Sequence, residues 1–239
     1  MQSPYEIIPA IMPAGLDDLT VKIDQIVGLV PVVQLDIMDG IFVPEKTWPY
    51  RTDSEYADSA GDQAYWEAIQ GGNAGLPMMD SVEYELDLMV DKPDQNLGEW
   101  LALQPSRIVF HVESIHDIEQ LLTDLAPVRD IIQIGISFDD DYSIEHLMHH
   151  YVEHFDFVQV MGIDHIGKQG EPFEERVIHN ILALQSVFPD KIVSVDGAVG
   201  RETITRLRDV GATRFVAGSA IYGEGDIAEN IEYLKNLLD

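Results

Sequence analysis

Residues 32–40 carry the sequence VVQLDIMDG, a run of apolar and β-branched side chains that ends in a polar turn. Such a run is typical of a parallel strand, because helices cover both faces of a parallel sheet. Residues 32–37 therefore predict a buried strand, and comparable runs recur along the chain. The other predicted strands are residues 7–12, 83–90, 107–112, 131–137, 155–161, 191–195 and 213–217.

Amphipathic stretches between these strands predict helices. Examples are residues 16–30, 94–104, 115–125, 143–154, 173–188, 201–210 and 226–238. Eight strand–helix units in 239 residues predict an α/β protein with the closed (β/α)8 architecture of a TIM barrel. A doubly wound open sheet is the alternative, because periodicity does not show closure. Residues 45–79 form a polar, aromatic-bearing connection too long for an ordinary loop, which predicts a lid or insertion within one domain spanning residues 1–239.

The composition excludes several classes of partner and of active site. The chain has 43 acidic and 14 basic side chains, so its net charge of −29 argues against a nucleic acid or an anionic membrane as partner. The absence of cysteine excludes disulfides, thiolate zinc sites and a cysteine nucleophile. Residues 1–16 lack the Lys or Arg of a signal peptide, and no apolar run approaches the roughly 18 residues that span a bilayer. We expect a cytoplasmic protein.

Three predicted strands carry a carboxylate at an interior or terminal position: Asp36, Asp87 and Asp196. A carboxylate within an apolar strand is costly unless it is paired, hydrogen-bonded or metal-bound. Strand alternation places Gln34 on the same side as Asp36. Because barrel active sites lie at the carboxyl ends of the strands, we expect these acids to converge there. In the alternative interpretation, each acid caps a helix or faces solvent.

The last two strands end in glycine turns, at Gly197 and at Gly218 with Ser219. Backbone N–H groups in such turns bind phosphate without a basic side chain, and this is the usual phosphate position in these barrels. Because the net charge repels anions, an anionic substrate requires such local dipoles. The turns therefore predict a phosphate site.

Five short motifs, in order, resemble those of the ribulose-phosphate 3-epimerase family of ribulose-phosphate-binding barrels. They are LDIMDG at 35–40 with FVP at 42–44, LMV at 88–90, FH at 110–111 with Glu113, VDG at 195–197, and AGSAI at 217–221 with Gly223. The resemblance spans nearly the whole chain apart from residues 45–79. It implies a TIM barrel that acts on a phosphosugar as a homo-oligomer.

The resemblance also implies a reaction, the inversion of C3 in a ketose phosphate, from D-ribulose 5-phosphate to D-xylulose 5-phosphate. Asp36 and Asp196 would be the acid/base pair, which moves protons through an enediolate. Met38 and Met89 align with methionines beside the intermediate, although plain core packing explains them equally well. The residues expected to bind substrate are Met38, Met89, His111, Gly197, Gly218 and Ser219.

Several positions depart from the family pattern. The two histidines of the family's metal site are replaced by Gln34 and Asp87, and a serine near the substrate ketone is replaced by Ala10. Ala198 stands where the family has a second glycine, and residues 163–170 replace the family's strand-6 loop.

The departures change the predicted metal site. The remaining ligand set contains only oxygen donors, which favours Mg²⁺, Mn²⁺ or Ca²⁺ over zinc. The candidate metal ligands are Gln34, Asp36, Asp87 and Asp196. The alternative is no metal, in which case another group must donate to the oxyanion at C2. The candidate donors are Gln34, His111, His165 and Lys168.

Two other functions stay open because the family's histidines and serine are absent. One is a diverged phosphosugar lyase or isomerase of the same barrel group, and the other is a non-catalytic phosphosugar-binding protein. His146, His150 and His154 recur every four residues, and we interpret them as a solvated or oligomer-facing helix surface; the alternative is an adventitious nickel or zinc site.

Overall fold

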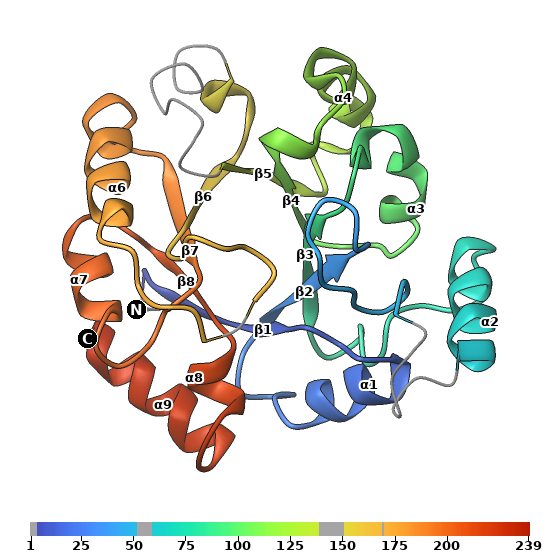
Figure 1. Cartoon of the computed structure of the whole chain (residues 1–239), viewed down its shortest axis with the longest axis horizontal. Coiled ribbons are helices and arrows are strands. Elements are labelled where there is room, and N and C mark those ends of the chain that lie inside the picture. The colour runs from blue at the N-terminus through green and yellow to red at the C-terminus, as the bar shows by residue number, and fades with distance from the viewer. Residues whose placement is uncertain (1–3, 52–58, 139–150, 169) are drawn as a thin grey trace. The chain divides into compact units, whose positions relative to one another are not determined.

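The computed structural model describes residues 4–51, 59–138, 151–168 and 170–239 (Figure 1). Eight strands form a closed barrel in chain order, with parallel pairing between neighbours. The strands are β1 (Glu6–Ile11), β2 (Val32–Met38), β3 (Glu83–Met89), β4 (Arg107–His111), β5 (Gln133–Phe138), β6 (Phe157–Met161), β7 (Ile192–Asp196) and β8 (Arg214–Ala217). The predicted TIM barrel is confirmed, and the predicted strand ends lie within two residues of the observed ones.

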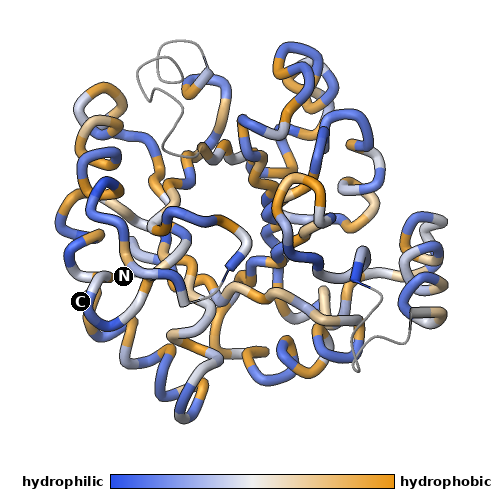
Figure 2. Tube along the Cα trace, in the orientation of Figure 1, coloured by the Kyte–Doolittle hydropathy of each residue, from blue (hydrophilic) through white to orange (hydrophobic). Residues whose placement is uncertain are grey.

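The helices of the described chain follow the strands. They are α1 (Leu16–Asp24), α2 (Ser59–Gln70), α3 (Leu97–Leu101), α4 (Ile118–Leu125), α6 (Arg176–Val187), α7 (Ile204–Asp209), α8 (Ser219–Tyr222) and α9 (Ile227–Leu238). Short 3₁₀ turns span Pro93–Asn96, Val112–Ser114, Ala126–Val128 and Val152–His154. Figure 2 shows alternating hydrophobic and hydrophilic segments along these helices, as expected where one face packs on strands.

The predicted helix over residues 143–154 is only partly within the described chain. His146 and His150 lie outside the described residues, and His154 ends a 3₁₀ turn. Among the described helices, none has the length and apolar character required to cross a bilayer.

The chain contacts group into two compact units, of which the first contains Ala10–Phe110 and Ser114–Ile132. In this unit β2 and β3 pair along their full length, from Val32 opposite Glu83 to Met38 opposite Met89. Every second residue of β2 is an apolar side chain with no exposed surface: Val33, Leu35 and Ile37. The pleat therefore turns the polar residues of β2 to the other face.

Residues 45–79 contain a helix that the sequence pattern does not predict, α2. Its sequence, SAGDQAYWEAIQ, contains a glycine and few aliphatic side chains, so the apolar period is weak. Contacts within the unit support it instead, because Trp66 packs edge-on against Trp48 with 5.5 Å between the ring centroids.

The second unit contains Met1–Pro9, His111–Glu113 and Gln133–Asp239. At the amino end of β8, the buried Arg214 lies 3.1 Å from a Glu6 carboxylate oxygen and donates to the Gln133 side chain at 2.7 Å. A buried arginine is thus paired with an acid and an amide at the amino ends of β1, β5 and β8. Barrel residues at that end serve stability, whereas the carboxyl ends carry the chemistry.

Candidate functional site

Polar side chains are concentrated at the carboxyl ends of β2 and β3. Asp36 lies opposite Asp87 in the strand pairing, and both carboxylates are buried. Gln34 has no exposed surface, and its amide nitrogen donates to Asp36 Oδ1 at 2.8 Å and to Asp87 Oδ2 at 3.5 Å. Gln34 therefore holds the two acids together as a donor, and it could ligate a metal only after its amide rotates.

Three carboxylates, those of Asp36, Asp87 and Asp196, could hold a metal ion. Each offers one oxygen, and these oxygens lie within 4.8 Å of one another. Like charges this close are unfavourable in a buried setting unless a cation or a proton neutralises part of the charge. The donors are oxygens, so the chemistry of the group fits a hard divalent cation.

The predicted methionines lie next along the same two strands. Met38 is opposite Met89, two residues beyond the paired acids, and both side chains are buried. By strand alternation they continue the face that carries Asp36 and Asp87. This placement is compatible with an apolar wall beside the acids and with plain packing.

The second aspartate of the strand-2 motif, Asp39, organises the turn rather than the acid group. One carboxylate oxygen accepts from the Ile41 and Phe42 backbone N–H groups at 2.8 and 3.1 Å. The other accepts from the Asp91 N–H at 2.8 Å, which ties the loop after β2 to the loop after β3. Burial and the charges of Glu99 and Asp39 raise the pKa of the nearby Tyr50 to about 12.

The end of β7 is a tight turn made by glycine. Gly197 has φ +91°, and a Cβ at this position would lie 2.7 Å from Ile163 Cγ1. The Gly162 N–H donates to the Asp196 carbonyl at 2.6 Å, and a Cβ on Gly162 would lie 2.2 Å from the Gly197 carbonyl oxygen. No side chain larger than glycine fits either position without movement.

Gly162 is a site residue that sequence reasoning missed. The signal was available, because a glycine directly follows each of β6, β7 and β8. Thr203 was also missed: its hydroxyl donates to the Ala198 carbonyl at 2.7 Å and accepts from the Gly200 N–H at 3.0 Å. This hydrogen bonding holds a turn in which Ala198 has φ +51°, a left-handed conformation that alanine rarely adopts.

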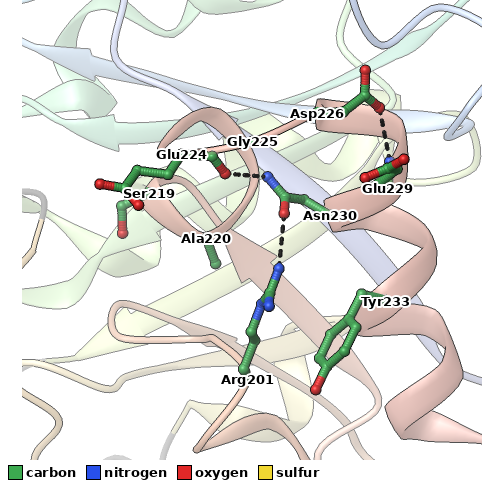
Figure 3. A pocket seen from close by; sticks show the side chains of 9 residues that line it. All are labelled: Arg201, Ser219, Ala220, Glu224, Gly225, Asp226, Glu229, Asn230 and Tyr233. Atoms are coloured by element: carbon green, nitrogen blue, oxygen red, sulfur yellow. Dashed lines mark hydrogen bonds between the residues drawn. The ribbon is translucent and has the colours of Figure 1, made fainter.

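Gly218 is the N-cap of α8 and Ser219 is its first residue, and Ser219 lines a pocket of about 690 Å³ in the same unit (Figure 3). Arg201 lines this pocket, donates to the Asn230 side-chain oxygen at 3.1 Å and lies 4.3 Å from the centroid of the Tyr233 ring. Three acids line it as well: Glu224, Asp226 and Glu229. Because one arginine stands among three acids, the side chains of this pocket attract an anion only weakly. Phosphate binding here would therefore depend on backbone N–H groups.

The predicted oxyanion donors differ in exposure. His111, the last residue of β4, has no exposed surface. His165 has 65% of its side chain exposed and lies 3.4 Å from a Glu171 oxygen, and Lys168 is exposed. The two residues of the loop after β6 therefore face water in this structure, whereas Gln34 and His111 are buried.

Comparison with known proteins shows which family the chain belongs to. The chain matches the model of the Ribulose-phosphate 3 epimerase family over residues 72–222. It is 26% identical to ribulose-phosphate 3-epimerase of Aquifex aeolicus (strain VF5) over 219 residues, which cover 88% of this chain and 86% of that protein. It is 23% identical to ribulose-phosphate 3-epimerase of Bacillus subtilis (strain 168), with coverage of 96% and 98%.

A solved structure of 3-hexulose-6-phosphate synthase from Salmonella typhimurium shares the fold, with a TM-score of 0.65 and 14% identity over 98% of this chain and 98% of that one. At this identity the likeness shows the fold alone. The family match is different in kind, because it covers more than half of the chain. This protein therefore belongs to the Ribulose-phosphate 3 epimerase family.

Proposed function

We propose that this protein inverts C3 of a ketose phosphate, converting D-ribulose 5-phosphate to D-xylulose 5-phosphate. Family membership supports a phosphosugar epimerase. The observation that carries the specific reaction is the carboxylate group of Asp36, Asp87 and Asp196, whose oxygens lie within 4.8 Å of one another. A two-base epimerisation needs at least two such groups near one carbon.

The proposed mechanism uses Asp36 as the base and Asp196 as the acid. Ionised Asp36 removes the C3 proton, and the electron pair of the broken C–H bond forms the enediolate. Protonated Asp196 then returns a proton to the opposite face of C3, and the reverse reaction exchanges the two roles. Repulsion between neighbouring carboxylates favours a state in which one is ionised and one protonated.

Asp36, Asp87 and Asp196 would hold a hard divalent cation. When bound, the cation supplies positive charge that stabilises the enediolate oxygens. The Gln34 amide donates to Asp36 and Asp87, which fixes the direction of both carboxylates. Met38 and Met89 would exclude water from the intermediate.

The substrate phosphate would bind to backbone N–H groups in the turns that contain Gly197 and Gly218–Ser219. These turns follow β7 and β8, the usual phosphate position in such barrels. A backbone site suits a protein of net charge −29, because it provides a local positive potential without a basic side chain.

Proton exchange tests this function directly. D-Ribulose 5-phosphate is incubated with the protein in D₂O with Mg²⁺ or Mn²⁺, and deuterium at C3 is followed by NMR. We expect deuterium at C3 together with D-xylulose 5-phosphate. If no ketopentose or ketohexose phosphate exchanges its C3 proton, the proposed function is wrong.

A non-catalytic phosphosugar-binding protein is the second candidate, favoured by Gln34, Asp87 and Ala10 at positions where the family has histidine and serine. The same samples separate the two functions. Ketose phosphates that raise the melting temperature without any proton exchange would indicate binding alone. A product with a cleaved carbon–carbon bond would instead indicate a lyase of the same barrel group.

A further inference from the structure

Thr47, in the segment that follows β2, returns to the end of that strand and binds its backbone. Its hydroxyl donates to the Asp36 carbonyl at 2.7 Å and accepts from the Met38 N–H at 2.9 Å. Its own N–H donates to the Met38 carbonyl at 3.1 Å. Thr47 is only 2% exposed, so these hydrogen bonds are shielded from water.

The hydrogen bonds of Thr47 lie where β2 extends past its neighbour β1 and, among the described residues, has no further pairing with it. The pairing of β2 with β1 reaches Leu35 opposite Ile11, and Ile11 is the last residue of β1. Asp36 and Met38 therefore extend beyond the end of β1. Thr47 supplies hydrogen bonds to the backbone on either side of Ile37, and so it fixes the point from which the Asp36 side chain projects.

Thr47 is itself anchored by the next residue. The Trp48 ring has no exposed surface, and its backbone N–H donates to the Pro13 carbonyl at 2.9 Å. Trp48 packs edge-on against Trp66 of α2 with centroids 5.5 Å apart, and Trp66 packs against Trp100 of α3 at 6.2 Å. These residues, which we call the tryptophan cluster, are the only three tryptophans in the chain.

Helix α2 is docked by polar contacts as well. The Leu16 N–H, at the start of α1, donates to both Asp62 carboxylate oxygens at 3.3 Å. The Gln70 side chain donates to the Glu99 carbonyl in α3 at 3.1 Å. A change in the docking of α2 would therefore reach β2 through Trp66, Trp48 and Thr47, a path made of direct contacts.

We propose that Thr47 is a positioning residue for Asp36, and that the tryptophan cluster couples the docking of α2 to it. This inference rests on the proposed function, in which Asp36 exchanges the C3 proton. An error of about 1 Å in the position of a reacting group costs roughly 100-fold in rate, so a mobile end of β2 would impair the reaction.

Substitution of the hydroxyl tests the positioning role. Thr47→Val keeps the shape of the side chain and removes both of its hydrogen bonds, whereas Thr47→Ser keeps the hydroxyl. We expect Thr47→Val to lower kcat for C3 exchange about 10- to 100-fold with little change in KM, and Thr47→Ser to retain kcat within about threefold. Thr47→Val at wild-type kcat, or Thr47→Ser as impaired as Thr47→Val, would overturn the inference.

A second pair of variants covers the case in which Thr47→Val does not fold. Trp66→Leu loosens the tryptophan cluster from α2, and Glu67→Gln changes the exposed neighbouring residue on the same helix. We expect Trp66→Leu to lower kcat about three- to tenfold and to red-shift the tryptophan emission, with Glu67→Gln unchanged in both. Altered emission with unchanged kcat would overturn the coupling.

Wild-type activity separates this inference from the proposed function. If wild-type protein exchanges the C3 proton and Thr47→Val does so equally well, only the positioning role is wrong. If wild-type protein exchanges no proton from any ketose phosphate, the proposed function fails and this inference fails with it.

Discussion

The carboxyl ends of β2 and β3 and those of β6, β7 and β8 are built from different groups. The first region uses side chains, because Gln34 hydrogen-bonds the buried Asp36 and Asp87. The second uses backbone shape, because a Cβ on Gly162 would lie 2.2 Å from the Gly197 carbonyl oxygen and a Cβ on Gly197 would lie 2.7 Å from Ile163 Cγ1. A site made of side chains can exchange ligands and keep its fold, whereas a site made of backbone accepts few substitutions.

The departures from the family pattern follow this division. In the side-chain region, the sequence resemblance places Gln34 and Asp87 at the positions of the family's histidines, and the pairing of β2 with β3 runs along their full length. In the backbone region, the resemblance aligns Gly197 and Gly218 with glycines of the family, and Ala198, aligned with a further glycine, has a left-handed φ of +51°. Four predictions test the comparison.

The largest effect is expected in the side-chain region, from Asp36→Asn. An amide of the same shape cannot accept the C3 proton, so kcat should fall about 1,000-fold or more, equivalent to about 4 kcal/mol, with phosphosugar affinity nearly unchanged. Deuterium exchange and calorimetric titration measure the two quantities. Asp196→Asn should behave alike, and the exposed acid Glu232, changed to Gln, is the control. More than a tenth of wild-type exchange in Asp36→Asn would contradict the assignment.

In the backbone region, Gly197→Ala should lower the free energy of unfolding by about 2–3 kcal/mol, measured by urea denaturation. The change adds left-handed strain and a Cβ that would lie 2.7 Å from Ile163. Gly28→Ala is the matched control, because Gly28 has φ +81° and a Cβ there would have nothing within 4 Å. This variant therefore adds backbone strain without a steric clash, and its free energy of unfolding should fall by only about 1 kcal/mol. Equal losses in the two variants would show that close packing at Gly197 is unimportant.

A ligand exchange in the side-chain region should alter metal preference without altering the fold. Gln34→His introduces an imidazole, so the affinity for Zn²⁺ relative to Mn²⁺ should rise about tenfold, or about 1.4 kcal/mol. Competition with a coloured chelator measures both affinities without an activity assay. Asn73→His, at an exposed position, is the control. An unchanged affinity ratio would place the metal, where one binds, away from Gln34.

The sequence could predict the strands and the acids because both follow from local pattern. Buried parallel strands carry long apolar runs, and alternation put Gln34 and Asp36 on one face. Helix α2 could not be predicted, because contacts of Trp66 and Asp62 stabilise a weak helical sequence. The direction of the Gln34 amide and the hydrogen bonds of Thr47 depend on segments that meet only in the folded chain.

The smallest effect, with the opposite sign, is expected from Ala198→Gly in the backbone region. Alanine at φ +51° is strained, and glycine removes that strain, which stabilises the folded state. Glycine also increases the conformational freedom of the unfolded chain, which lowers stability. The strain is the larger of the two, so the variant should be more stable by about 0.5–1 kcal/mol in urea denaturation. Ala183→Gly within α6 is the control and should lose about 1 kcal/mol, because helical alanine is unstrained. If Ala198→Gly is destabilised as much as Ala183→Gly, the turn held by Thr203 stabilises alanine in this conformation, and the backbone region tolerates substitution as readily as the side-chain region.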